Sequence, residues 1–159
     1  MIRLGRESII SDLTLMETVP KAAQYGELYL RTVVKGIQDL EPEVELDLDE
    51  VQGPGVTKME CLVVTPTVKR LRHYQSLHFA KPMGGSLQMG YYVTGGDRFN
   101  TGSLFGGDTF GIGKPTDADL DNIVSIVKVI RDYAVAPAIQ HVADLVQSGG
   151  QRQGGFLGL

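Results

Sequence analysis

The sequence predicts an α+β protein, built from an antiparallel sheet of four to six strands with helices packed on one face. Three observations support this class. Apolar residues recur with a helical period before position 40, with a strand period from position 44 to position 94, and with a helical period again after position 116. The prediction therefore places an N-terminal helix, then the sheet, then a long helix with a proline kink near the C-terminus.

The N-terminal helix is expected over residues 18–40. Thr18 is a suitable N-cap and Pro20 suits the first helical turn, while Pro42 is expected to end the helix. Residues 7–15, which precede it, fit either a strand or a short helix. The apolar stripe of the predicted helix consists of Ala22, Tyr25, Tyr29, Val33, Ile37 and Leu40.

The middle of the chain predicts an antiparallel meander. In the first strand Val44, Leu46 and Leu48 alternate with acidic residues, so one face is apolar and the other is acidic. Residues 52–55 are typical of a turn. The further strands are expected over residues 56–65, 68–80 and 86–94, with a turn at 82–85 before the last of them.

The long helix is expected to begin at Thr116, because Thr116 and Asp119 have the spacing of a capping box. Its core stripe is Ile123, Ile126, Val127, Ile130 and Ala134. Pro137 is expected to kink or divide the helix, which should end at residues 148–150. A helix-grip architecture, in which a curved sheet wraps such a helix around a ligand cavity, is an alternative reading of the same pattern.

Length and composition predict one domain in residues 1–148 and a flexible glycine-rich tail with an apolar end in residues 149–159. The 159 residues are 42% hydrophobic and 21% charged, which is typical of a globular chain with one core. The single cysteine, Cys61, cannot form an internal disulfide and lies among apolar residues. We therefore expect a cytoplasmic protein in which Cys61 is an inert core residue.

Charge and hydropathy argue against two classes of partner. The net charge of −4 makes nucleic acid an unlikely partner, since proteins that bind it usually carry a basic excess. The most apolar stretch, residues 123–136, is interrupted by Lys128 and Arg131, so no membrane span is predicted.

No catalytic residue, metal site or cofactor is predicted. His73 and His78 are five residues apart on a presumed strand, which sends their side chains to opposite faces. No histidine, cysteine or carboxylate spacing matches a known zinc pattern, and no nucleophile motif is present. The protein is therefore expected to lack enzymatic activity, although the sequence leaves this open.

A glycine-rich segment, residues 95–113, contains the pattern G-G-D-x-F-x-x-G twice. Its aspartates are Asp97 and Asp108. Paired glycines permit positive φ and an aspartate can bond its own backbone, so two structural turns are the first interpretation. A lid over a ligand, or a cation site formed by Asp97 and Asp108, is the alternative.

Two functional hypotheses follow from these residues. In the first, which we prefer because no catalytic group is recognisable, the chain is a non-catalytic assembly subunit that forms homo- or hetero-oligomers. The predicted partner-binding residues are Lys69, Arg70 and Arg72 of a basic strand, and Phe156, Leu157 and Leu159 of the apolar end. The acidic run at residues 39–50 could pair with the basic strand within one sheet or between subunits.

In the second hypothesis, the chain binds a small molecule, or is an enzyme, with a cavity between the sheet and the long helix. The residues expected to line that cavity are Tyr74, His78, Tyr91 and Tyr92, with the glycine-rich segment as its cover.

Overall fold

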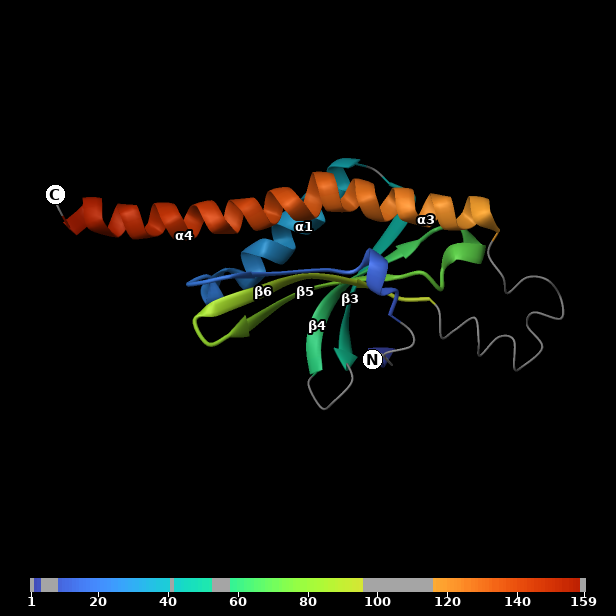
Figure 1. Ribbon diagram of the computed structural model, residues 1–159, viewed down its shortest axis with the longest axis horizontal. Coiled ribbons are helices and arrows are strands. Elements are labelled where there is room, and N and C mark those ends of the chain that lie inside the picture. Colours follow the sequence, from blue (N-terminus) through green and yellow to red (C-terminus); the bar gives the residue numbers. More distant parts are fainter. Residues whose placement is uncertain (1, 4–8, 41, 53–57, 96–115, 158–159) are drawn as a thin grey trace.

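The computed structural model describes residues 2–3, 9–40, 42–52, 58–95 and 116–157, with side chains through 149 (Figure 1). The strands are β1 (Ile2–Arg3), β2 (Leu15–Val19), β3 (Val44–Gln52), β4 (Lys58–Pro66), β5 (Ser76–Met83) and β6 (Ser86–Val93). The α-helices are α1 (Gly26–Leu40), α3 (Asp117–Ile130) and α4 (Ala136–Leu157). The predicted α+β class is confirmed.

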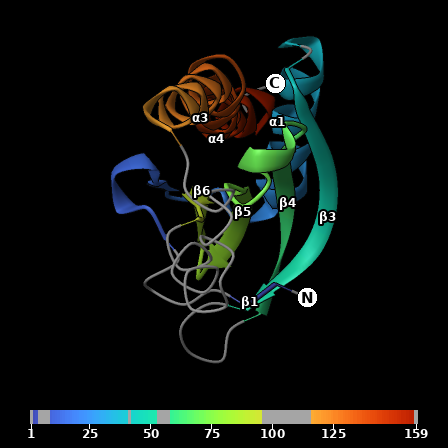
Figure 2. The ribbon, with the colours of Figure 1, turned by 90° about the vertical axis from the view of Figure 1, so that its right-hand side faces the viewer.

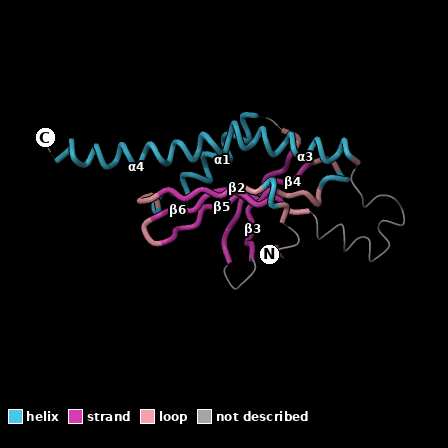
Figure 3. The backbone as a smooth tube through the Cα atoms, viewed as in Figure 1, coloured by secondary structure: helices cyan, strands magenta, loops and turns pink. Residues whose placement is uncertain are grey.

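The strands form one sheet in the order β1-β3-β4-β5-β6-β2, and Figure 3 shows the strands on one side of the long helix. The strands from β3 to β6 form the predicted antiparallel meander, and β2 joins it by pairing antiparallel with β6. The two residues of β1 pair parallel with the end of β3. In β3 the predicted alternation holds for Val44 and Leu46, which pack on the helix-side core, whereas Leu48 is exposed and Val51 is buried on the opposite face.

The long helix consists of α3, a π turn at Arg131–Val135 and α4, which run on from one another across the sheet (Figure 1). The predicted capping box is present: Thr116 Oγ1 accepts the Asp119 N–H at 3.1 Å, and Asp119 Oδ2 accepts the Thr116 N–H at 3.0 Å. The irregularity expected at Pro137 is the π turn before it, where the Ala136 N–H bonds the Arg131 carbonyl five residues back.

The long helix extends beyond the predicted end at residues 148–150. Its backbone is helical through Leu157, where a flexible tail was expected, and in Figure 1 this end projects past the sheet. The described helix therefore includes most of the glycine-rich segment that follows Ser148.

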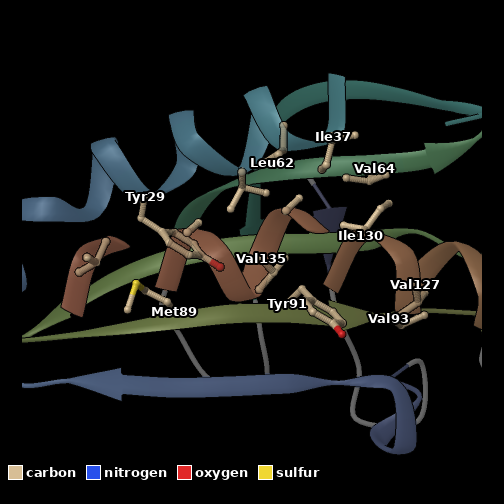
Figure 4. Close-up of a cluster of buried hydrophobic side chains, with 14 of the residues drawn as sticks. Tyr29, Ile37, Leu62, Val64, Met89, Tyr91, Val93, Val127, Ile130 and Val135 are labelled. Atoms are coloured by element: carbon tan, nitrogen blue, oxygen red, sulfur yellow. The ribbon is translucent and has the colours of Figure 1, made fainter. Parts of the chain in front are cut away.

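Both α1 and the long helix lie on the same side of the sheet, as predicted (Figure 2). Tyr29, Val33 and Ile37 of α1 are buried against the sheet and the long helix, and Figure 4 shows Tyr29 directed into this cluster. At Gly36 the two helices approach closely, because a Cβ there would lie 2.9 Å from both Cα and Cβ of Ala134. A smaller buried cluster on the opposite sheet face contains Val51, Cys61, Val63, Leu77 and Phe79.

The predicted start of the first helix was wrong. Thr18 lies in β2, Pro20 and Lys21 form a turn in which Lys21 has φ of 62°, and α1 begins at Gly26 after a short 3-10 helix. Pairing of Leu15–Val19 with β6 determines this outcome, and such a nonlocal contact overrides the local capping signal.

The prediction of one strand over residues 68–80 was also wrong. Lys69–Leu71 form a 3-10 helix whose Leu71 is fully buried, and β5 begins only at Ser76. Burial of a single apolar side chain between exposed basic residues suits one helical turn better than an extended strand. The basic residues consequently lie on a turn at the end of the sheet.

Candidate functional site

A groove of about 810 Å³ lies between α1 and the sheet, on the side of α1 that faces away from the long helix. We call it the α1 groove. In Figure 2, α1 lies between the long helix and the curving strand β3. The groove is lined by Ala23, Gln24, Gly26, Glu27, Leu30, Arg31, Val34, Lys35 and Gln38 beside or within α1, and by Leu48, Lys58, Met59, Glu60, Leu62, Ala80, Lys81 and Pro82 from the sheet.

The wall of the groove is a second apolar stripe on α1. Leu30 and Val34 each follow a core residue, Tyr29 and Val33, by one position. Because successive residues are about 100° apart on a helix, this offset places Leu30 and Val34 at the border of the core, where they also line the groove. The small residue Gly26 deepens one end, since it brings the backbone of α1 close to the sheet.

The floor of the groove continues into the core through a cross-strand row. Leu48 of β3 pairs with Leu62 of β4, which pairs with His78 of β5, which pairs with Tyr91 of β6. Leu48 is 59% exposed, whereas Leu62, His78 and Tyr91 are at most 2% exposed. The row is therefore exposed in the groove at Leu48 and buried from Leu62, on the neighbouring strand, onward.

His78 is a buried polar side chain where the floor meets the core. Among the described residues neither ring nitrogen has a hydrogen-bond partner, and the ring lies against Tyr91 with the centroids 5.0 Å apart. Burial lowers the pKa of His78 to about 3, so the imidazole is neutral at neutral pH. The Tyr29 hydroxyl is also buried without a hydrogen-bond partner in the described part of the chain, and burial raises its pKa.

The four residues predicted to line a cavity under the long helix divide between the two sheet faces. Tyr74, His78 and Tyr91 lie on the helix side, while Tyr92 stacks on Phe79 on the other side. Side chains of the core fill the space under the long helix, and the cavity beside Tyr74 measures about 10 Å³, the room of one water molecule. The larger groove lies beside α1.

Two of the three basic residues predicted to bind a partner form ion pairs within the chain. Arg72 donates to Glu45 at 2.9 Å, which is the pairing of basic and acidic runs considered from the sequence. Arg70 donates to Asp119 at 2.8 Å and so ties the 3-10 helix to the start of α3. The Thr116 backbone N–H, more than Arg70, holds the pKa of Asp119 below its usual value. Lys69 is exposed.

Strand β3 presents a partly open edge, because β1 pairs only with its last two residues. The Thr67 N–H bonds the Glu43 carbonyl, so the odd-numbered residues of β3 direct their backbone groups toward β4 and the even-numbered ones toward the open edge. There the N–H groups of Leu48 and Glu50 bond the carboxylates that precede them, Asp47 and Asp49, at 2.9 and 2.8 Å. These donors are already occupied.

Some predicted residues fall outside the described part of the chain: Asp97, Asp108 and Leu159, together with the side chains of Phe156 and Leu157. Cys61 is described and fully buried, as predicted, and burial raises the pKa of its thiol to about 12. That pKa leaves almost no thiolate at neutral pH, in keeping with an inert core residue.

The α1 groove was not predicted from the sequence, because its residues come from four separated segments and match no motif. One available signal was the pair Leu30 and Val34, which makes the apolar surface of α1 wider than a single core stripe. The other was Leu48, an apolar residue in a strand whose other face is acidic.

The described ranges contain no group of three or more His, Cys, Asp or Glu side chains arranged to hold a metal ion. None of the described helices combines the length and apolar character that crossing a bilayer requires. In comparisons with protein-family models, curated protein sequences and solved structures, the chain matches none of them.

Proposed function

We propose that the protein is a non-catalytic binding module that holds an elongated apolar small molecule in the α1 groove. The observation that carries this proposal is the groove itself. Its volume of about 810 Å³ falls within the range of about 300–1,000 Å³ that is usual for small-molecule sites. It follows α1, whose 15 residues span about 22 Å, so an extended molecule fits better than a round one.

The distribution of exposed side chains favours a narrow ligand over a protein helix. Of the large apolar residues that line the groove, Leu48 is strongly exposed, whereas Leu30, Val34 and Leu62 are recessed. A partner helix is about 10 Å wide, and a stable protein interface buries about 800 Å² on each side. A recessed apolar trough suits an aliphatic chain, which can enter between α1 and the sheet.

The test is a titration with N-phenyl-1-naphthylamine, an uncharged fluorophore whose emission rises in apolar surroundings. We expect saturable binding to the wild-type chain and a loss of affinity of about tenfold in Leu48→Gln, since this change removes apolar contact from the floor. Leu48 is exposed, so the substitution leaves the fold intact.

Met16→Gln is the matched control. Met16 is also an exposed apolar strand residue, at 44% against 59% for Leu48, but it lies on β2 at the opposite edge of the sheet. We expect wild-type affinity in Met16→Gln. Equal affinities in wild type, Leu48→Gln and Met16→Gln would refute the groove as the binding site, and absence of saturable binding to the wild type would refute the proposal.

Assembly of copies or of different proteins is the second candidate, and a different surface favours it. Val129 and Tyr133, one turn apart on the long helix, are 41% and 67% exposed. Exposed apolar residues that lie together often mark contact sites. If this surface mediates association, Tyr133→Ser should lower the mass measured by light scattering during size-exclusion chromatography, and an unchanged mass would count against it.

A further inference from the structure

The charged residues around the α1 groove differ in sign from the chain as a whole. The chain has a net charge of −4, yet the groove is lined by four basic residues and two acidic ones. The basic residues are Arg31, Lys35, Lys58 and Lys81, and the acidic residues are Glu27 and Glu60. The lining therefore carries an excess of two positive charges in an acidic protein.

Ion pairing within the chain leaves this excess of two positive charges on the lysines. Arg31 is paired with Glu27 on the next turn of α1. Among the residues that the structure describes, Lys35, Lys58 and Lys81 form no ion pair. Within the described chain, the border of the apolar trough therefore carries three ammonium groups and one carboxylate, that of Glu60, outside any ion pair.

We infer that the ligand of the α1 groove is an amphipathic anion, with an aliphatic chain on the apolar floor and a single carboxylate-like group at the lysines. This inference rests on the proposed function and specifies its ligand class. Lysine has a long apolar stem and a mobile charged end, so Lys35, Lys58 and Lys81 can reach an anionic group while their stems cover the chain. An ammonium ligand would meet three like charges and one opposite charge.

The experiment compares dodecanoate with dodecylammonium, two ligands of the same chain length and opposite charge, by calorimetry below their aggregation concentrations. The full-length chain should bind dodecanoate at least tenfold more tightly than dodecylammonium. In the triple variant Lys35→Gln, Lys58→Gln, Lys81→Gln, the affinity for dodecanoate should fall at least tenfold. Binding of N-phenyl-1-naphthylamine should stay within about twofold, because the apolar floor is unchanged.

A second triple variant controls for overall charge. Lys21→Gln, Lys69→Gln, Lys128→Gln removes three exposed lysines that do not line the groove, so the net charge changes by the same amount. This control should bind dodecanoate like the wild type. A preference for dodecanoate that rises at low salt and is lost only in the groove variant would support the inference.

The outcomes separate the inference from the proposed function. If the fluorophore binds in the groove but dodecanoate and dodecylammonium bind equally, the inference is overturned and the proposed function stands. An equal loss of dodecanoate affinity in both triple variants also overturns it, since the effect would then come from overall charge. If neither fluorophore nor dodecanoate binds the wild-type chain, both are overturned.

Discussion

The two sides of α1 have opposite surroundings although they belong to one helix of 15 residues. On the side toward the long helix, Val33 is fully buried and Gly36 leaves no room for a methyl group beside Ala134. On the other side, Val34 borders the α1 groove, and a methyl group on Gly26 would make ordinary contacts of 3.5–3.6 Å. Packing against the long helix therefore fixes α1 from one side, and its other side remains available.

The largest expected effect comes from the core side. Ile37 is 1% exposed, so Ile37→Ala should lower the free energy of unfolding by about 2–5 kcal/mol through lost burial and a cavity. Val34→Ala, on the groove side, should cost less than about 1 kcal/mol. Urea denaturation of both variants measures the difference, and similar losses would show that the two sides are equally important for stability.

A change in pH probes the core next to the groove. The folded-state pKa of His78, about 3, lies below its unfolded value of about 6.5, so the folded state binds fewer protons. The contribution of neutral His78 to the free energy of unfolding should therefore be fully present above pH 6.5. It should fall by about 2 kcal/mol between pH 6.5 and pH 4.5.

His78→Leu removes the titrating group and is the variant for this measurement. Its unfolding free energy should vary less with pH from 6.5 to 4.5 than that of the wild type, as urea titrations at several pH values would show. Parallel pH profiles for the two proteins would contradict the burial of a neutral His78.

The two glycines of α1 give the most direct comparison of its sides. Gly36→Ala should destabilise the protein by about 1–3 kcal/mol, because the new methyl group overlaps Ala134, and this exceeds the gain in helix propensity of about 1 kcal/mol. Gly26→Ala should leave stability unchanged or raise it slightly. Thermal unfolding of both variants is the test, and a stabilising Gly36→Ala would mean that the helices can separate at little cost.

The smallest effect is expected at the rim of the groove. Arg31 and Glu27 form an exposed ion pair one turn apart, and such pairs contribute about 0.3–0.5 kcal/mol. Arg31→Gln should therefore change the unfolding free energy by less than about 0.5 kcal/mol, with a smaller difference in high salt. A loss above 1 kcal/mol would indicate that the rim supports the fold.

The sequence was sufficient to predict an element where its local pattern agrees with the tertiary contacts that the element makes. The capping box at Thr116 is fixed by hydrogen bonds within one turn, and Val44 and Leu46 pack on the core as their alternation with acidic residues indicated, so both were predictable. The core stripe of Tyr29, Val33 and Ile37 was found for the same reason.

Where distant segments decide the outcome, the prediction failed. Thr18 has the features of an N-cap, but pairing of its segment with β6 places it in a strand. Leu71 becomes buried only because a 3-10 turn closes the end of the sheet. The α1 groove was not predicted for the same reason, since Leu48 and Val34 line one groove only when α1 packs on the sheet.

The edge of β3 affects the tendency of the protein to aggregate when many copies are present. An unprotected edge strand can template an added strand, and repetition of that step produces a cross-β fibril. In β3, Asp47 and Asp49 occupy two of the outward N–H groups and place carboxylates beside the edge. Fibril growth from this edge would have to break those bonds and bring like charges together, so crowding alone should not seed it.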